Sequence, residues 1–105
     1  MAQYDVFVNP NPNSRATVPY VVDVQSALID RLPTRLVMPL SLVGASESKL
    51  PLNLCPRVTV AGLSLTLMPQ LSAPIPVRML RDPVASLGHR ALEVSAAMDA
   101  VLSGF

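Results

Sequence analysis

Proline spacing divides this chain into two parts that cannot fold in the same way. All eleven prolines fall between positions 10 and 83, and residues 84–105 contain none. Each proline fixes φ and removes a backbone N–H donor, so residues 1–83 are cut into pieces too short for long helices. The spacing predicts a β-rich region over residues 1–82, followed by one C-terminal helix.

The pieces between the prolines are rich in Val, Thr, Ile and Leu, and several of them alternate as half-buried strands do. Two such pieces flank Gly62, which offers a tight turn, so RVTVAGLSLTLM is predicted to be a hairpin. The segments NPNPNS (9–14) and GASESKLP (44–51) are predicted to be loops. We expect a twisted antiparallel sheet or small barrel, built from the runs YDVFV, VPYVVDVQ, TRLVMPLSLV, PRVTV, LSLTLM and IPVRML.

The predicted helix spans residues 83–102 and leaves a terminal tail of residues 103–105. Asp82 suits the N-cap of a helix and Pro83 suits its first position. Apolar residues then recur at spacings of three and four, which predicts one apolar stripe made of Val84, Leu87, Ala91, Val94, Met98 and Val101. Arg90, Glu93 and Ala97 are placed on the opposite face. Residues 1–105 are interpreted as a single domain.

Composition excludes several classes of protein. The formal net charge is +1, which argues against a broad basic face for nucleic acid. No apolar run approaches the roughly 20 residues of a membrane span, and MAQYDVFV lacks the pattern of a signal peptide. The single cysteine, Cys55, cannot form an internal disulfide, which suits a reducing compartment. We therefore expect a cytoplasmic protein with no membrane partner.

Residue patterns for catalysis are missing from the sequence. The single histidine, His89, is interpreted as a helix-surface residue, and Cys55 as a small buried side chain. Histidine, cysteine and carboxylate residues form no group with metal-ligand spacing, and the four glycines are too scattered for a phosphate-binding loop. We expect no catalytic residue, no metal and no cofactor.

The last two residues, Gly104 and Phe105, place a large apolar ring on the terminal carboxylate. Chain ends are usually polar and frayed, so this composition needs a reason. Two interpretations are open from the residues: the ring fills a groove of its own domain, or it enters a partner. Leu28 and Ile29 present the same choice, since they belong either to the core or to an exposed recognition patch.

At YVVDVQSALID, followed by TRLVMPLSLV, the sequence resembles the CcdB family of gyrase-poisoning toxins from toxin–antitoxin modules. The resemblance runs from Tyr20 to Asp30, then through Arg35, Pro39 and Leu40. It continues in order through LCPRVTV, MPQLSAPIPVRML and VASLGHRALEVSAAMDAVLSGF. It covers nearly the whole chain at matching length.

The resemblance implies the mainly β toxin fold that CcdB shares with MazF: a twisted antiparallel sheet, or small SH3-like barrel, with one C-terminal α-helix. It implies a non-enzymatic homodimer that binds the A subunit of DNA gyrase and traps the cleaved-DNA complex. It also implies a cognate CcdA-like antitoxin that neutralises the toxin, with transcription autoregulation. Contact with operator DNA is expected only through the antitoxin complex.

The resemblance also implies the gyrase-binding residues. They match family positions at the N-terminus, in the turn after the second strand and at the end of the helix: Gln3, Tyr4, Ser26, Leu28, Ile29, Asp99, Leu102, Ser103, Gly104 and Phe105. Exposure and polarity suggest Arg15 as an antitoxin contact.

One departure from the family pattern lies at Ser103, where the best-known members carry a tryptophan that stacks against gyrase arginines. Serine has no π face, so a cation–π contribution of roughly 1–2 kcal/mol is absent. This keeps open a degenerate toxin that retains only antitoxin binding.

A second alternative is a MazF-type endoribonuclease toxin. Such an enzyme needs a basic groove and an arginine with a hydroxyl partner, for which the candidates are Arg15, Arg35 or Arg57 with Thr17, Thr34 or Thr59.

Overall fold

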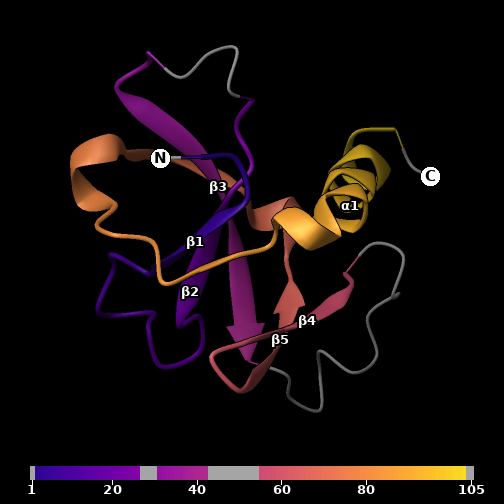
Figure 1. Cartoon of the computed structure of the whole chain (residues 1–105), viewed down its shortest axis with the longest axis horizontal. Helices are drawn as coiled ribbons and strands as arrows, with labels where there is room; N and C mark the ends of the chain where they lie inside the picture. The colour runs from indigo at the N-terminus through magenta and orange to yellow at the C-terminus, as the bar shows by residue number, and fades with distance from the viewer. Residues whose placement is uncertain (1, 27–30, 43–54, 104–105) are drawn as a thin grey trace.

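The computed structural model describes residues 2–26, 31–42 and 55–103. Within them, seven strands form one antiparallel sheet and one α-helix, α1 (Ala91–Ser103), follows at the C-terminal end (Figure 1). The sheet is nearly closed and barrel-like, so the predicted fold class is confirmed. In spatial order its main path is β4 (Arg57–Val60), β5 (Leu63–Leu67), β3 (Thr34–Leu42), β2 (Tyr20–Asp23), β1 (Asp5–Val8) and β7 (Ala85–Ser86), while β6 (Ala73–Pro76) pairs with β3 off this path.

The predicted hairpin is present as β4 and β5, joined by Ala61 and Gly62. Both turn residues have positive φ, 51° for Ala61 and 80° for Gly62, and Val60 pairs with Leu63. Two positive φ angles between paired strands are typical of the turn whose twist matches the twist of the strands. Alternation then buries Val58 and Val60 on one face, as the sequence predicts.

Strand β3 lies at the centre of the sheet and contains Pro39. On one side it pairs with β2 along residues 37–40. On the other side it pairs first with β6, at residues 34–37, and then with β5, at residues 40–42. Pro39 lies on this side at the point where the partner of β3 changes from β6 to β5. The carbonyl of Pro39 accepts a hydrogen bond from the N–H of Met68 (3.0 Å). A residue without an N–H is tolerated there because the regular ladder is interrupted at that point.

Both faces of the sheet are covered. Successive strand residues point to opposite faces, so Val6, Val22 and Met38 lie on one face and Phe7, Val21 and Val37 on the other. Val94 of α1 and Leu87 pack in the first and larger cluster. Leu80 closes the second cluster, with Ile75 at its margin. Burial of these apolar side chains is the main force that holds α1 and residues 75–80 on the sheet.

The predicted helix start at Pro83 is wrong, because the chain continues as sheet edge before it becomes helical. The N–H of Val84 donates to the carbonyl of Val6 (2.8 Å), and Ala85 and Ser86 pair with β1. A 3₁₀ turn, η5 (Gly88–Arg90), comes next, and α1 begins at Ala91. Pairing with β1 satisfies backbone groups that the helix would have used, so tertiary contact overrides the capping signal at Asp82.

The predicted helical stripe is also only partly right. Val94 is buried as expected, but Ala97, placed on the polar face, is fully buried, and Val101 is 38% exposed. The buried face of α1 is therefore formed by Val94, Ala97 and Ala100. Small residues at 97 and 100 allow the helix to approach the sheet closely.

The run IPVRML is not a single strand. Ile75 and Pro76 end β6, and the chain then forms a 3₁₀ turn, η4 (Val77–Met79). A second 3₁₀ turn, η3 (Pro69–Leu71), follows β5. The predicted loop 44–51 lies outside the described residues. Among the residues that the structure does describe, no helix has the length and apolar character needed to cross a membrane.

Candidate functional site

The turn after β2 is built on a buried ion pair. The Arg35 Nε donates to the Asp23 Oδ2 (2.8 Å), and the two side chains are 3% and 0% exposed. The other Asp23 oxygen accepts from the N–H of Gln25 (3.0 Å), and the Arg35 Nη2 donates to the Gln25 carbonyl (3.2 Å). A buried charge is tolerated when it is paired and its remaining sites are hydrogen-bonded, as they are here.

The polar side chains of Asp23 and Gln25 at this turn are directed into the fold and not to solvent. Asp23 and Gln25 are both buried, and the Gln25 Oε1 accepts from the N–H of Leu36 (3.0 Å). Asp23 and Gln25 thus fasten the turn to β3. Their side chains hold the segment that leads to Ser26 and do not form its outer surface.

The N-terminal residues implied by the resemblance lie beside this turn. The Gln3 Nε2 donates to the carbonyl of Val24 (3.1 Å), and both Gln3 and Ser26 are half-buried. Tyr4 has a φ of 73°; its N–H donates to the Asp23 carbonyl (2.6 Å) and its carbonyl accepts from the N–H of Leu87 (2.8 Å). The structure therefore brings Gln3, Tyr4 and the turn before Ser26 into one region.

A second group lies at the end of α1. Leu102 is 78% exposed, and Asp99 and Ser103 are exposed as well. The Ser103 Oγ donates to the carbonyl of Asp99 (2.6 Å), four residues earlier, so the serine hydroxyl is bonded back to its own helix. Leu92, two helical turns before Asp99 and on the same side of the helix, is 85% exposed.

Four of the implied residues, Leu28, Ile29, Gly104 and Phe105, lie outside the described residues. The remaining ones form the two groups above, the first around β1 and the turn after β2 and the second at the end of α1. Within one protomer the candidate gyrase-binding residues are thus divided between the turn region and the helix end.

Arg15 lies in a loop that is fixed by a buried asparagine. The Asn9 Nδ2 donates to the Ser14 Oγ (2.9 Å) and to the Val18 carbonyl (2.8 Å), while its Oδ1 accepts from the N–H of Asn11 (3.0 Å). The Arg15 Nε donates to the Asn9 carbonyl (2.8 Å), and the Arg15 side chain is exposed. Segment 9–14 is the loop that the sequence predicts.

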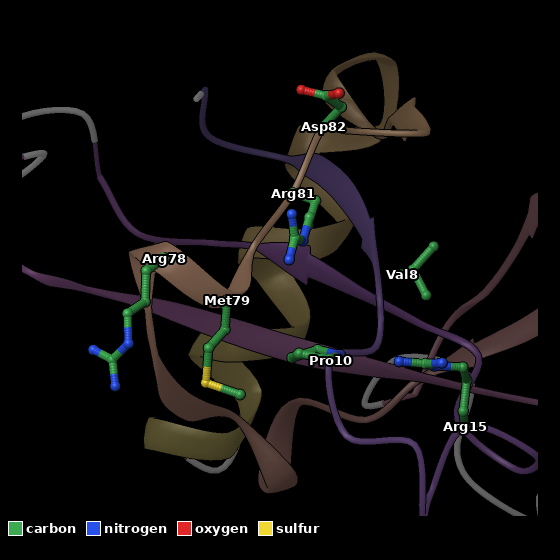
Figure 2. A pocket seen from close by; sticks show the side chains of 7 residues that line it. All are labelled: Val8, Pro10, Arg15, Arg78, Met79, Arg81 and Asp82. Atoms are coloured by element: carbon green, nitrogen blue, oxygen red, sulfur yellow. The ribbon is translucent and has the colours of Figure 1, made fainter.

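Arg15 also lines a hollow of about 450 Å³ that sequence reasoning missed. Val8, Pro10, Arg78, Met79, Arg81 and Asp82 line it with Arg15 (Figure 2). Figure 2 shows the guanidinium of Arg15 directed toward Pro10 and the carboxylate of Asp82 turned away from the three arginines. The two arginines on either side of Leu80, Arg78 and Arg81, were the available sequence signal, but their meaning depends on Val8 and Asn9, which are distant in the chain.

Groups associated with catalysis remain separated in the structure. Across residues 2–26, 31–42 and 55–103, no three His, Cys, Asp or Glu side chains come close enough to hold a metal. Cys55 is buried, and this burial raises the pKa of its thiol, which disfavours the reactive thiolate. His89 is exposed in η5. Arg35, one candidate for ribonuclease chemistry, is committed to the buried pair with Asp23.

The chain matches the model of a known protein family over nearly all of its length. The model of the CcdB protein family matches residues 3–104 of this 105-residue chain. The match takes in β1, the fastened turn after β2, the β4–β5 hairpin and all of α1. CcdB proteins are toxins of toxin–antitoxin modules that target gyrase and act without catalysis. With its nearly closed antiparallel sheet and single C-terminal helix, the chain belongs to the CcdB family.

Proposed function

We propose that this protein is the toxin of a type II toxin–antitoxin module that binds the A subunit of DNA gyrase and traps the cleaved-DNA complex. It acts as a homodimer in the cytoplasm and is neutralised by a cognate CcdA-like antitoxin. Operator DNA is contacted only through the complex with the antitoxin. The protein breaks no bond itself, and its effect comes from fitting into its target.

The observation that carries this proposal is the exposed apolar surface of α1. Leu92 and Leu102 are 85% and 78% exposed on a helix whose other face is packed against the sheet. Exposed apolar side chains of this size, grouped on one element, are typical of a protein–protein contact. In the sequence, Phe105 follows the last residue of α1 by two positions and adds a further large apolar side chain to this end of the chain.

The family match supports the direction of this contact, since gyrase is the target of CcdB proteins. In our proposal Asp99, Leu102, Ser103, Gly104 and Phe105 enter gyrase. Gln3, Tyr4, Ser26, Leu28 and Ile29 form the second part of the contact surface. In a two-fold dimer each element is presented twice, which suits a target that is itself a dimer.

The test measures binding of the purified protein to the dimerisation domain of gyrase A. Deletion of residues 103–105 should abolish binding and the trapping of cleaved DNA without unfolding the protein. Ser103→Trp should strengthen binding about tenfold, the effect of a cation–π contact near 1–2 kcal/mol. Leu63→Ser, at the β4–β5 turn, serves as the control, because Leu63 is an exposed leucine outside α1.

Three results would contradict the proposal. A truncated protein that still traps cleaved DNA would show that the chain end is not the gyrase contact. Wild-type protein that fails to bind gyrase but binds its antitoxin would identify a degenerate toxin. Cleavage of RNA by the pure protein, with normal gyrase activity in its presence, would identify the endoribonuclease alternative.

A further inference from the structure

Tyr4 has a backbone conformation that aromatic residues rarely adopt. Its φ of 73° lies in the left-handed region, which favours glycine because a Cβ atom is crowded there. Among the described residues, Ala61 is the one other non-glycine residue with positive φ, and the turn between β4 and β5 accounts for it. Tyr4 lies instead where the chain enters β1. A conformation that costs free energy persists only where the surrounding structure fixes it.

Backbone hydrogen bonds to two distant segments fix the conformation of Tyr4. Its N–H donates to the carbonyl of Asp23 at the end of β2 (2.6 Å). Its carbonyl accepts from the N–H of Leu87, which is buried just before η5 (2.8 Å). The peptide groups on either side of Tyr4 are therefore held between the turn after β2 and the approach to α1.

The register of β1 and β2 contains a one-residue bulge at Tyr4. The pair formed by Val6 and Val22 sets this register. One residue earlier, Asp5 falls opposite Asp23, and the N–H of Tyr4 donates to Asp23 as well. Two residues opposite one form a β-bulge, and in one common type the first of the two is a glycine with positive φ. Such bulges redirect side chains and are frequent beside functional sites.

The side chain of Asp5 closes the turn that contains Tyr4. The Asp5 Oδ2 accepts from the N–H of Ala2 (3.0 Å), and the N–H of Asp5 donates to the Ala2 carbonyl (3.1 Å). These two bonds join the ends of a four-residue turn with Gln3 and Tyr4 at its centre. A turn with positive φ at its third residue normally has glycine or asparagine there. Because tyrosine occupies that position, the closed turn depends on the bonds that hold it.

The closed turn leaves polar atoms of Gln3 and Tyr4 available to a partner. The Tyr4 ring is half-buried against the larger core cluster, and its hydroxyl has no hydrogen-bond partner among the described residues. The Gln3 Nε2 donates to the Val24 carbonyl (3.1 Å), while its amide oxygen accepts no bond within the same part of the chain. A tyrosine with a packed ring and an open hydroxyl is typical of protein–protein contacts.

From these observations we infer that Asp5 is a positioning residue for the gyrase contact at Gln3 and Tyr4. Its carboxylate keeps the bulged turn closed, so that both side chains are held in one conformation before the partner arrives. A binding-competent conformation that is already populated raises the apparent affinity. The inference rests on the proposed function of this surface and adds a residue that acts through its neighbours.

The experiment compares Asp5→Ala and Asp5→Asn for binding to the dimerisation domain of gyrase A. Alanine removes the acceptor for the Ala2 N–H and should weaken binding about two- to tenfold, the effect of one hydrogen bond. Asparagine removes the charge but keeps an acceptor oxygen, so Asp5→Asn should bind nearly as the wild type does. Asp82→Ala is the matched control, because Asp82 is an exposed aspartate outside the candidate gyrase-binding residues.

Amide hydrogen exchange gives a second measurement that does not require gyrase. In Asp5→Ala the protection of the Tyr4 N–H should fall, while the amides of the central strand β3 keep theirs. Ala2→Pro removes the donor of the same hydrogen bond and should reproduce both effects of Asp5→Ala. The double variant should be little weaker than either single variant, since each alone breaks the bond.

The inference is overturned if Asp5→Ala binds gyrase as tightly as the wild type or leaves the protection of Tyr4 unchanged. Equal losses in Asp5→Ala and Asp5→Asn would show that the carboxylate acts through its charge and not through the turn. An equal loss in Asp82→Ala would assign the effect to overall charge. Wild-type protein that does not bind gyrase would instead contradict the proposed function, and the protection of Tyr4 would still decide whether Asp5 holds the turn.

Discussion

The turn after β2 and the end of α1 differ in the burial and hydrogen bonding of their side chains. At the turn, the side chains of Arg35 and Asp23 are 3% and 0% exposed, and their hydrogen bonds fix the backbone around Gln25. At the end of α1, Leu102 is 78% exposed and the Ser103 hydroxyl returns to its own helix. The polar groups of the turn are hydrogen-bonded within the fold, while the apolar side chain of Leu102 at the helix end is left exposed. Changes at the turn should therefore affect folding, and changes at the helix end should affect binding.

The largest effect is expected for Arg35→Met. This variant leaves the Asp23 carboxylate buried without its cation, which should lower the free energy of unfolding by about 3–5 kcal/mol. Urea titration followed by circular dichroism measures the loss. The double variant Asp23→Asn/Arg35→Met should recover part of it, because the buried charge is gone. A loss below about 1 kcal/mol in the single variant would mean that the pair does not hold the turn.

A smaller loss is expected for Val94→Ala, which tests the packed side of α1. Val94 is fully buried in the larger cluster, so removal of its two methyl groups should cost about 2 kcal/mol. Val101→Ala is the matched control, since Val101 lies on the same helix and is 38% exposed. Urea titrations of both variants make the comparison, and equal losses would show that α1 is not held through Val94.

Leu102→Ser should change the free energy of unfolding by no more than about 0.5 kcal/mol, because an exposed side chain loses little on folding. The same variant should bind the gyrase A dimerisation domain more weakly, while Leu63→Ser binds as the wild type does. Thermal unfolding and a binding titration on the same samples separate the two effects. A large loss of stability would place Leu102 in a packed contact.

The smallest effect concerns Glu93 on the exposed side of α1. The Arg90 Nε donates to its Oε1 (2.9 Å), and this hydrogen bond holds the pKa of Glu93 below its usual range. A carboxyl group with a lowered pKa stabilises the fold above its unfolded pKa of about 4.3, and that stabilisation disappears as the pH falls through the folded pKa. The difference in unfolding free energy between wild type and Glu93→Gln should therefore be small near neutral pH and shrink in acid. A difference that grows in acid would contradict this sign.

Local chemistry explains which parts of the fold the sequence could predict. The β4–β5 hairpin depends on Ala61 and Gly62 and on alternation within a few residues, so the residues that determine it are neighbours in the sequence. The start of α1 depends on β1, because Val84 through Ser86 pair with Val6 and Asp5. Asp82 and Pro83 have the right chemistry for a helix start. The backbone of the residues that follow them pairs instead with β1, which is distant in the sequence.

In the candidate site, too, some features are set by neighbouring residues and others by contacts between distant parts of the chain. Leu102 is exposed at the end of a helix, and such exposure is a local property of the chain. Asp23 is different, because its role is set by Arg35, which no spacing rule connects to it. The arginine hollow requires two distant segments, one with Val8 and Asn9 and one with Leu80, to come together. Contacts between distant segments arise only in the folded chain, so no run of neighbouring residues in the sequence indicates them.

Pro39 has a consequence for how the surface of the molecule is divided. By dividing one side of β3 between β6 and β5, it separates two branches of the sheet. One branch continues into η4 and the arginines; the other continues into η3, against which α1 packs. The two branches therefore present different surfaces, the side chains of Arg78 and Arg81 beside one and the packed contact with α1 on the other. The one residue of β3 that lacks an amide hydrogen thus lies where the sheet divides into these two surfaces.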